Sequence, residues 1–324
     1  MLLHPQFKTR TIAAGLSGRD IVGLADTGTG KTAAFAIPVL NKLISDRNSM
    51  AVILAPTREL AQQIDEQFRA IARGSGLRSV VLIGGAPMGR QLAELRNKPR
   101  LIIGTPGRIK DHLDRRSLNL NYCNIVVLDE VDQMLDMGFV QDIKYILNLT
   151  SKQKQAFYFS ATLDERVKGI IEGFSVDPLH IDVKQGNTSD NVDQNIVSYS
   201  SQDDKIDKLH DLLIKDGVNK TLVFDDTHRS VDRLSKELVA RGFIVDSIHG
   251  GKSQSQRQAV LKKFRDSRIT VLVATDVAAR GLDVSDITHV VNYSSPRTYK
   301  DYIHRIGRTG RAGKTGYALT FVEK

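Results

Sequence analysis

Residues 25–32 combine glycines, a lysine and a hydroxyl in an order that suits phosphate binding. They read Ala-Asp-Thr-Gly-Thr-Gly-Lys-Thr and match G-x-x-x-x-G-K-[ST], except that Ala25 replaces the first glycine. The backbone N–H groups of such a loop cradle phosphates at a helix N-terminus. We expect Lys31 to reach the outer phosphates of a nucleotide and the Thr32 hydroxyl to bind Mg²⁺. The alternative is a chance glycine turn.

Acidic residues follow an apolar run at residues 126–132, Val-Val-Leu-Asp-Glu-Val-Asp. Mg²⁺ bound to a nucleotide keeps several waters and takes only one or two carboxylates. Asp129 can therefore hold the ion through water, and Glu130 can orient or deprotonate an attacking water. The alternative is a solvated acidic turn after a strand.

Composition sets the broad class of the protein. A chain of 324 residues predicts two domains, and there is no apolar run long enough to span a membrane. The first residues do not form a signal peptide, and the single cysteine, Cys123, excludes a disulfide framework and a cysteine-cluster metal site. These features fit a cytoplasmic location. The net charge of +9, shared by both halves, suggests a polyanionic partner.

Short apolar strands alternate with helical patterns in the first half of the chain. The strands are rich in Val, Ile and Leu on both faces, as in a parallel sheet covered by helices. They are expected at Asp20–Ala25, Ala51–Ala55, Ser79–Gly84, Arg100–Gly104, Asn124–Leu128 and Ala156–Ser160. Helices are expected from Thr32 onward and at Glu59–Arg73, Val140–Asn148 and Glu165–Phe174. This pattern predicts an α/β doubly wound domain.

A second α/β series follows a polar segment without periodicity. We expect a first domain at 1–184, a linker at 185–194 and a second domain at 195–324. Strands are expected at Asn195–Ser200, Thr221–Asp225, Ile244–His249, Thr270–Ala274, His289–Tyr293 and Tyr317–Val322. Helices are expected at Lys205–Lys215, Ser230–Arg241, Gln254–Arg265 and Tyr299–Ile306. Because only the first domain has a phosphate loop, a site in a cleft between two similar folds is expected.

Nine short motifs follow one another in the order and spacing of one family. They are ADTGTGKT (25–32), PTREL (56–60), GG (84–85), TPGR (105–108), DEVD (129–132), SAT (160–162), QSQR (254–257), VATDVAARGLDV (273–284) and HRIGRTGR (304–311). With them the chain resembles the DEAD-box RNA helicases of superfamily 2, in a DEVD variant. The resemblance covers essentially the whole chain and implies a helicase core only. Its fold would be two tandem RecA-like doubly wound parallel-sheet domains with an inter-domain cleft.

The resemblance also implies one ATP site, with Mg²⁺, shared by the two domains. ATP would be bound by Thr27, Gly28, Thr29, Gly30, Lys31 and Thr32 of the first domain and by Gly281 and Asp283 of the second. Thr32 and Asp129 would bind Mg²⁺, Glu130 would be the catalytic base, and Arg308 and Arg311 would be arginine fingers. Coupling between the domains would fall to Asp132, Ser160, Thr162, Arg280, His304 and Arg305. Glycines and threonine between the arginines of HRIGRTGR favour a functional loop over a basic surface helix.

An RNA surface is implied by the remaining motifs. Its residues would be Pro56, Thr57, Arg58, Gly85, Thr105, Pro106, Gly107, Arg108, Gly250, Gln254, Arg257 and Thr275. Most are small, hydroxyl or arginine residues after strands, which suits contact with phosphate and ribose. The chain has no Trp and is only 6% aromatic, so sequence-nonspecific binding without base stacking is expected. Contact with the 2′-OH would favour RNA over DNA.

Five positions depart from the family pattern. The glutamine that reads adenine would fall at Lys8, with Gln6 two positions away, so adenine selectivity is an open point. Val131 replaces an alanine in the acidic motif and would add bulk beside the site. Asp225 and Asp226 stand where apolar or amide residues are usual near RNA, and Gly251 stands where an acid is usual.

The resemblance implies an RNA-dependent ATPase, a DEAD-box RNA helicase that separates short RNA duplexes. In the family's mechanism ATP and single-stranded RNA together close the two domains. An alternative is an ATP-gated RNA clamp or assembly scaffold with little unwinding, and another is a DNA-directed translocase of the same superfamily. A monomer is expected, without membrane contact; protein partners are not visible in the sequence.

Overall fold

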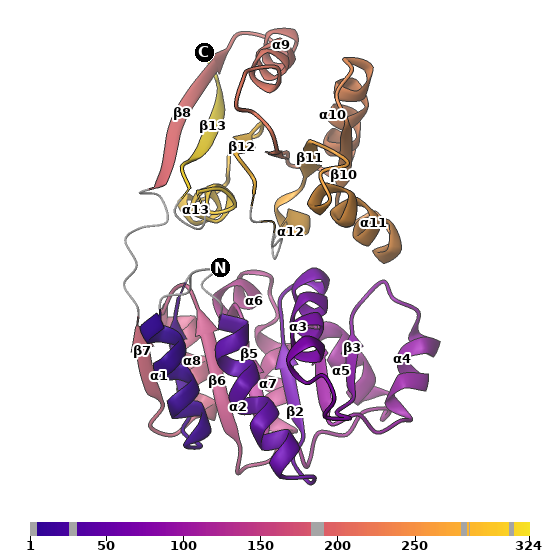
Figure 1. Cartoon of the computed structure of the whole chain (residues 1–324), viewed down its shortest axis with the longest axis vertical. Coiled ribbons are helices and arrows are strands. Elements are labelled where there is room, and N and C mark those ends of the chain that lie inside the picture. The colour runs from indigo at the N-terminus through magenta and orange to yellow at the C-terminus, as the bar shows by residue number, and fades with distance from the viewer. Residues whose placement is uncertain (1–4, 26–30, 183–190, 280–283, 285, 311–313) are drawn as a thin grey trace. The chain divides into compact units, whose positions relative to one another are not determined.

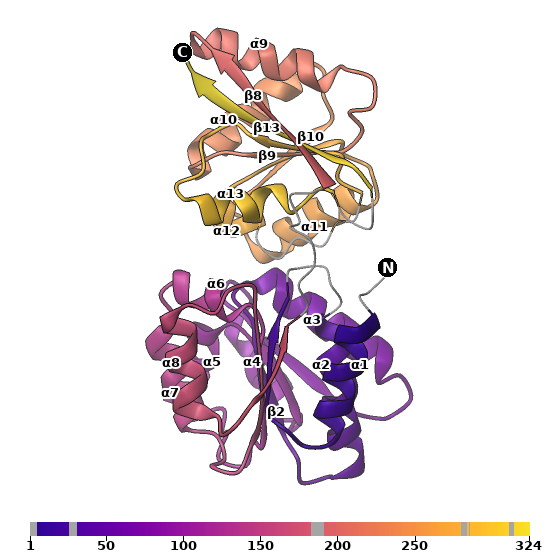
Figure 2. The same cartoon turned by 90° about the vertical axis from the view of Figure 1, so that its left-hand side faces the viewer.

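The computed structural model describes residues 5–25, 31–182, 191–279, 284, 286–310 and 314–324. The chain divides into two compact units, residues 1–185 and 186–324. Each unit is a parallel β-sheet with helices on both faces (Figures 1 and 2). The predicted fold class, two doubly wound α/β domains, is thereby confirmed.

The sheet of the first unit has the strand order β3-β4-β2-β5-β6-β1-β7, with parallel pairing throughout. Its strands are β1 (Ile21–Leu24), β2 (Ala51–Leu54), β3 (Ser79–Leu82), β4 (Leu101–Gly104), β5 (Ile125–Leu128), β6 (Gln155–Ser160) and β7 (Leu179–Asp182). Alternate residues of β2 enter two different cores, Ala51 and Ile53 on one face and Val52 and Leu54 on the other. Burial on both faces is the reason why these strands read as continuous apolar runs.

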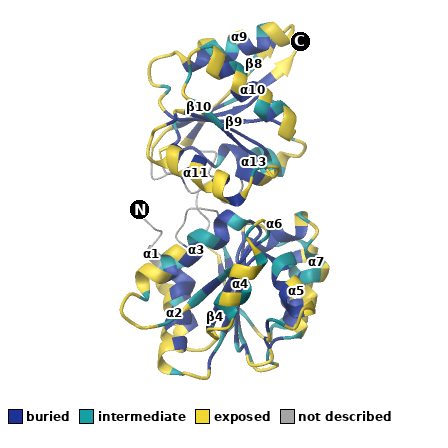
Figure 3. Cartoon of the chain, turned by 90° about the vertical axis from the view of Figure 1, so that its right-hand side faces the viewer, coloured by how far each residue is buried: buried dark blue, intermediate teal, exposed yellow. Residues whose placement is uncertain are grey.

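Helices cover both faces of this sheet (Figure 3). One core contains residues of α1 (Pro5–Leu16), α2 (Lys31–Ser45) and α3 (Arg58–Ile71). The other contains residues of α5 (Pro106–Asp114), α6 (Val131–Asp136), α7 (Val140–Asn148) and α8 (Glu165–Phe174). Helix α4 (Met88–Leu95) contacts β3 at the edge of the sheet.

The second unit repeats this plan with the strand order β10-β11-β9-β12-β13-β8, again all parallel. Its strands are β8 (Val192–Tyr199), β9 (Thr221–Phe224), β10 (Val245–Ile248), β11 (Val271–Ala274), β12 (His289–Asn292) and β13 (Gly316–Glu323). Its helices are α9 (Gln202–Leu213), α10 (His228–Ala240), α11 (Gln254–Arg265), α12 (Asp276–Ala279) and α13 (Tyr299–Ile306). Residues of α9 and α10 share one core, and residues of α11 and α12 share another.

All twelve expected strands are present, and the described residues hold one more, β7, which pairs with β1. The expected end of the linker is wrong, because β8 already begins at Val192 and runs beside β13. The first three residues of this strand are missed because it forms the edge of the sheet and five of its eight side chains are exposed, so its start reads as polar. Residues 183–190 of the expected linker region lie outside the described residues.

Candidate nucleotide and nucleic-acid site

The strand order of the first sheet sorts the motif-bearing loops into two groups. The loops after β5, β6 and β1, which are neighbours, carry the acidic, Ser-Ala-Thr and phosphate-loop motifs. The loops after β3, β4 and β2, also neighbours, carry the GG, TPGR and PTREL motifs. Parallel strands end at the same edge of a sheet, which is where ligands bind in such folds. One half of this edge therefore suits a nucleotide and the other half a nucleic acid.

Lys31 and Asp129 form the buried ionic centre of the nucleotide half. Lys31 is the first residue of α2, and its Nζ donates to the Ala25 carbonyl at 2.9 Å and lies 4.0 Å from Asp129 Oδ1. Both side chains are at least nine-tenths buried. Burial raises the pKa of Asp129, and the Lys31 charge opposes that rise.

This donor set fits a magnesium–nucleotide complex. Asp129 Oδ1 is buried and accepts no hydrogen bond from the described residues, so a water or cation would satisfy it. Thr32 follows Lys31 in α2 and is half-buried. Within the described residues, no three His, Cys, Asp or Glu side chains are arranged to hold a metal ion. One carboxylate and one hydroxyl are nevertheless what Mg²⁺ needs when phosphates and waters complete its shell.

Glu130 has an unusual backbone conformation for its residue type. Its φ and ψ are both 55°, in the left-handed region, and its side chain is buried. Such a conformation costs an L-residue roughly 1–2 kcal/mol, so its surroundings must impose it. Asp129 N–H donates to the Leu54 carbonyl on one side, and Val131 is buried in the core on the other. The turn between β5 and α6 is thus held at both ends.

Hydrogen bonds join the three motifs of the nucleotide half. Thr162 Oγ1 donates to Asp132 Oδ2 at 3.2 Å, and Asp132 N–H donates to Ser160 Oγ at 3.4 Å. Ala25 N–H donates to the Ser160 carbonyl at 3.1 Å. The predicted coupling residues of the first domain therefore lie together, between the acidic motif and the start of the phosphate loop.

The nucleic-acid half is ordered around two arginines. Thr57 caps α3 by accepting from Leu60 N–H at 3.2 Å, and Arg58 begins that helix. The Arg58 guanidinium lies so close to Gly84 and Gly85 that a Cβ atom at Gly85 would overlap it. Arg108 Nη1 donates to the Ala86 carbonyl at 3.3 Å. The PTREL, GG and TPGR loops are therefore in contact with one another. The sequence alone could not show this contact.

A further residue in this half, Gln91, was not predicted. It is buried in α4, accepts from Ile83 N–H, and donates to the Ile83 and Ala86 carbonyls, all at 3.2 Å. The side-chain amide thereby fixes both ends of the loop that contains Gly84 and Gly85. The only sequence feature that could have indicated this role of Gln91 is its position, as a single polar residue on the apolar side of a short helix.

The other predicted residues of this half lie at helix starts. Pro56 is buried directly before Thr57, and Thr105 is the N-cap residue of α5 without a side-chain cap bond. Pro106 occupies the first turn of α5. At Gly107 a Cβ atom would have only ordinary contacts, with Phe139 and Asp142.

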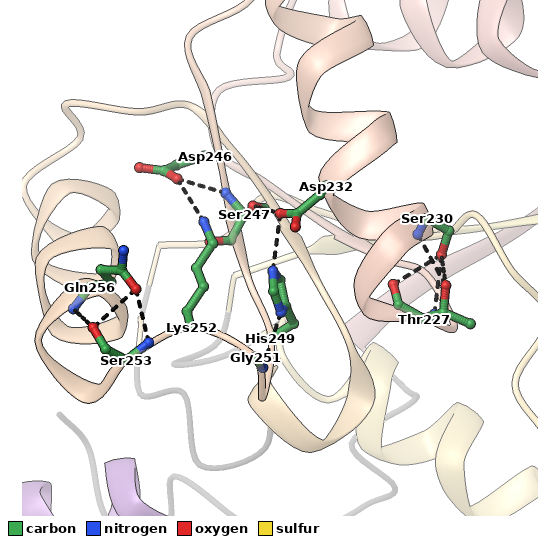
Figure 4. A network of polar contacts seen from close by, with 10 residues as sticks. All are labelled: Thr227, Ser230, Asp232, Asp246, Ser247, His249, Gly251, Lys252, Ser253 and Gln256. Atoms are coloured by element: carbon green, nitrogen blue, oxygen red, sulfur yellow. Dashed lines mark hydrogen bonds and ion pairs between the residues drawn. The ribbon is translucent and has the colours of Figure 1, made fainter. Parts of the chain in front are cut away.

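In the second unit, Gly250 lies in a loop organised by histidines. Figure 4 shows His249 between Asp232 and Gly251: its Nε2 lies 3.0 Å from Asp232 Oδ1, and Gly251 N–H donates to its Nδ1 at 3.2 Å. The ring of His228 stacks on His249 with a centroid distance of 4.8 Å. The stacked rings lie against Gly250 and Gly251, which leaves little room for a larger residue at either position.

Three predicted RNA-binding residues of the second unit are largely enclosed by the fold. Gln254 begins α11 after its N-cap Ser253, and both Gln254 and Arg257 are buried. Thr275 follows β11, and its N–H donates to the Ile248 carbonyl at 3.3 Å. All three therefore lie at the carboxyl end of β10 and β11, the same edge as Gly250.

Arg305 is the most enclosed arginine of the chain's described part. Its Nε and Nη2 donate to the two Asp276 carboxylate oxygens at 2.6 and 2.7 Å, and its Nη1 donates to the Ser294 carbonyl at 2.7 Å. It thus clamps α13 to α12. His304 and Arg305 lie in the last turn of α13, which ends at Ile306 as expected, so the loop of the HRIGRTGR motif begins only at Gly307. These residues continue the helix because the glycines come only after Ile306.

Arg308 is 4% exposed, and its Nε donates to the His304 carbonyl at 3.3 Å. Several other predicted residues lie outside the described residues: Thr27, Gly28, Thr29, Gly30, Arg280, Gly281, Asp283 and Arg311.

The structure shows where four of the residues that depart from the family pattern lie. Val131 lies in the hydrophobic core, not beside the site as expected, because α6 turns it inward. Lys8 is half-buried in α1, next to Phe7, which packs on Phe159. Asp225 is buried, whereas Asp226 is exposed and accepts from Ser294 Oγ at 2.9 Å.

Comparison with protein families gives two matches. The family model for DEAD/DEAH box helicases matches residues 6–170, and that for the helicase conserved C-terminal domain matches residues 204–313. No helix within the described ranges is long and apolar enough to cross a membrane.

Curated relatives and solved structures match almost the whole chain. The DEAD-box ATP-dependent RNA helicase CshA of Bacillus subtilis is 45% identical over 317 residues, which cover 97% of this chain and 64% of the relative. The ATP-dependent RNA helicase CshA of Listeria monocytogenes is 44% identical, with 97% and 61% coverage. This chain thus spans less than two thirds of their length.

Saccharomyces cerevisiae Dbp5 bound to RNA and ADP BeF3 superposes with a TM-score of 0.85 at 29% identity, covering 98% of this chain and 83% of that one. A DEAD box protein from Methanococcus jannaschii is 37% identical, with a TM-score of 0.55 and coverage of 98% and 86%.

Proposed function

Because the chain belongs to the DEAD/DEAH box helicase family, we propose that it is an RNA-dependent ATPase that unwinds short RNA duplexes. One observation carries this proposal most directly. The buried Lys31–Asp129 pair lies on the same sheet edge as the contiguous loops around Arg58 and Arg108. A nucleotide and a nucleic-acid strand can therefore bind side by side on one rigid scaffold.

In this proposal each residue of the nucleotide half has one task. Lys31 binds the outer phosphates, and Asp129 and Thr32 hold Mg²⁺, which neutralises charge on the phosphates. Glu130 accepts a proton from the attacking water. Arg308 and Arg311 stabilise the charge that develops on the γ-phosphoryl group. Because these arginines belong to the other unit, hydrolysis requires the two units to close around ATP.

The proposed nucleic-acid partner is single-stranded RNA or a short duplex, bound without sequence preference. Support comes from the loops themselves, in which Thr57, Thr105 and Gly85 offer hydroxyl and backbone groups rather than aromatic rings. Closure on ATP and one strand would displace the other strand. We further propose a cytoplasmic monomer in which a first domain, 1–184, is followed by a second domain that begins no later than Val192.

The assignment of the base is tested by Glu130→Gln. This change keeps the shape of the side chain but removes its ability to accept a proton, so RNA-stimulated ATP hydrolysis should fall by at least about 10²-fold. Binding of ATP and RNA should remain within about twofold. Glu165→Gln serves as the control, since the Glu165 side chain is 88% exposed at the start of α8. Hydrolysis at the parent rate in Glu130→Gln would contradict the proposal.

An ATP-gated RNA clamp is the second candidate function, favoured by two departures from the family's sequence pattern. Lys8 stands where the resemblance implies an adenine-reading glutamine, and Asp225 and Asp226 place negative charge at the carboxyl end of β9. Phosphate release with and without saturating RNA distinguishes the two functions: stimulation supports the helicase, and its absence supports the clamp. Comparing RNA with DNA of equal length tests the preference for RNA.

A further inference from the structure

A small acidic cavity lies in the second unit. It has a volume of about 180 Å³ and is bounded by the start of α9, by α10, and by the residues that follow β9 and β12. A water molecule occupies about 30 Å³ in the liquid, so the cavity can hold a small ligand group. Its charged lining residues are Asp203, Asp225, Glu237 and Arg233.

The charge of this cavity is opposite to that of the chain. Three carboxylates face one guanidinium there, whereas the whole chain carries a net charge of +9. RNA phosphates would be repelled there, so the cavity does not suit a nucleic acid. The cavity also accounts for Asp225, an acid that the RNA-binding motifs leave unexplained.

Asp225 is built into the wall of the cavity. It is 8% exposed, its Oδ1 accepts from Asp226 N–H at 2.9 Å, and none of the described residues forms an ion pair with it. Arg233 lies exposed and likewise has no ion-pair partner in the described part of the chain. The Asp225 carboxylate therefore has no ion-pair partner in the described part of the chain, and a cationic ligand would supply one.

Tyr293 adds a polar group from another element to the lining of the cavity. It is 9% exposed, and one face of its ring is covered by Lys205 Nζ, 4.3 Å from the ring centroid. No hydrogen bond to its hydroxyl exists among the residues that the structure describes, although the residue lines the cavity. Burial, followed by the nearby charges of Glu237 and Asp225, raises the pKa of Tyr293 to about 12. The hydroxyl is thus protonated at neutral pH, near the charges of both carboxylates.

We propose that this cavity binds the guanidinium group of an arginine side chain presented by a protein partner. A planar guanidinium carries five N–H donors in a rigid fork, which can serve the Asp225 and Glu237 carboxylates and the Tyr293 hydroxyl oxygen together. A lysine ammonium is a compact and strongly hydrated point charge, so it would match this set less well. The inference is independent of the proposed ATPase activity.

Titration of the ¹⁵N-labelled full chain with Nα-acetyl-arginine amide tests the inference by NMR. We expect saturable shift changes at the amides of Asp225, Ser230 and Glu237, and none of comparable size with the neutral citrulline or the lysine analogue. Equal shifts with either analogue, or shifts confined to other regions, would overturn the proposal.

Two substitutions locate the site. Asp225→Asn preserves the acceptor for Asp226 N–H but removes the charge, so the affinity should fall by about tenfold or more. Asp226→Asn is the matched control, because this neighbouring acid is exposed and bonded to Ser294, and it should leave the affinity within about twofold. Glu237→Gln, on α10, gives a second test should Asp225→Asn fail to fold. Unchanged affinity in folded Asp225→Asn or Glu237→Gln would refute the proposal.

Discussion

At the scale of single residues, Glu130 shows how the fold places a reactive group. The left-handed backbone turns the chain sharply between β5 and α6, so Asp129 and Glu130 both stay at the sheet edge while Val131 enters the core. A right-handed start of the helix would alter the direction of the Glu130 carboxylate. The strain is therefore part of how the proposed base is positioned.

Comparing the stabilities of the Glu130→Gly and Glu130→Ala variants measures the cost of this backbone strain. Both variants lose the carboxylate and should lose hydrolysis, but glycine adopts a φ of +55° without steric cost. We expect the glycine variant to be more stable than the alanine variant by about 1 kcal/mol, measured by urea unfolding. Equal or reversed stabilities would show that the left-handed conformation is not retained.

His112 makes the stability of the first unit depend on pH. Its ring is buried in α5, its Nδ1 lies 2.8 Å from Ser117 Oγ, and its Nε2 has no hydrogen-bond partner among the described residues. Burial, and then the charge of Arg108, lowers the pKa of His112. The unfolded chain therefore binds the proton more readily, and stability is lost as the pH falls below about 6.5.

Substitution His112→Gln should remove this part of the pH dependence. The parent chain should lose up to about 1.4 kcal/mol per pH unit from this group below its unfolded pKa. Unfolding of the first unit in denaturant, compared at about pH 7.5 and 5.5, measures the difference. His289→Gln is the control, since burial also lowers the pKa of His289 but in the second unit. An identical loss of first-unit stability in His112→Gln and the parent would contradict the assignment.

At the scale of elements, the strand order does most to build the site. Motifs that alternate along the chain become two contiguous sets because β2 lies between β4 and β5, and β1 lies beside β6. Within the nucleic-acid set, side chains from one loop support the next: Arg58 lies against Gly85, Arg108 reaches Ala86, and Gln91 holds both ends of the GG loop.

Gly85→Ala should weaken RNA binding through Arg58. Gly85 has a φ of +76°, and its new Cβ atom would overlap the Arg58 guanidinium and displace it. Gly138→Ala is the matched control, because Gly138 has a φ of +85° but a Cβ atom there meets nothing within 4 Å. Both variants carry a backbone cost of about 1 kcal/mol. Only Gly85→Ala should lower RNA affinity, by about tenfold in fluorescence anisotropy; equal effects would contradict a role for this contact.

At the scale of the whole molecule, the chain is two separately cored units. Their hydrophobic clusters share no residues, and each sheet is complete by itself. The proposed chemistry nevertheless draws on both, since Lys31 and Asp129 belong to the first unit and Arg308 to the second. A reaction that requires both sets should therefore be controlled by how ATP and RNA bring the units together.

Small-angle scattering tests whether ATP and RNA together bring the two units closer. We expect the radius of gyration to decrease when a non-hydrolysable ATP analogue and single-stranded RNA are added together, and to change less with either alone. Glu130→Gln should behave as the parent does, because the change leaves both binding surfaces intact. A radius of gyration that is unchanged by both ligands would count against closure.

The sequence by itself determined the fold class, the twelve expected strands and the identity of the motif residues. Strands covered on both faces read as apolar runs, and a phosphate loop or an acidic motif is a local pattern of residue types, so both are visible along the chain. The polar edge strand β8 shows the limit: with few buried side chains, its start at Val192 left no hydrophobic signal.

Only the tertiary structure decided which motifs are neighbours. Strand order depends on contacts between residues far apart in sequence, so the chain order of the motifs cannot show that the PTREL loop lies between the TPGR and acidic loops. The same holds for the Arg305–Asp276 clamp, the Gln91 anchor and the cavity between Asp225 and Tyr293, whose partners come from separate elements. The left-handed turn at Glu130 is likewise imposed from outside, by β2 on one side and the core on the other.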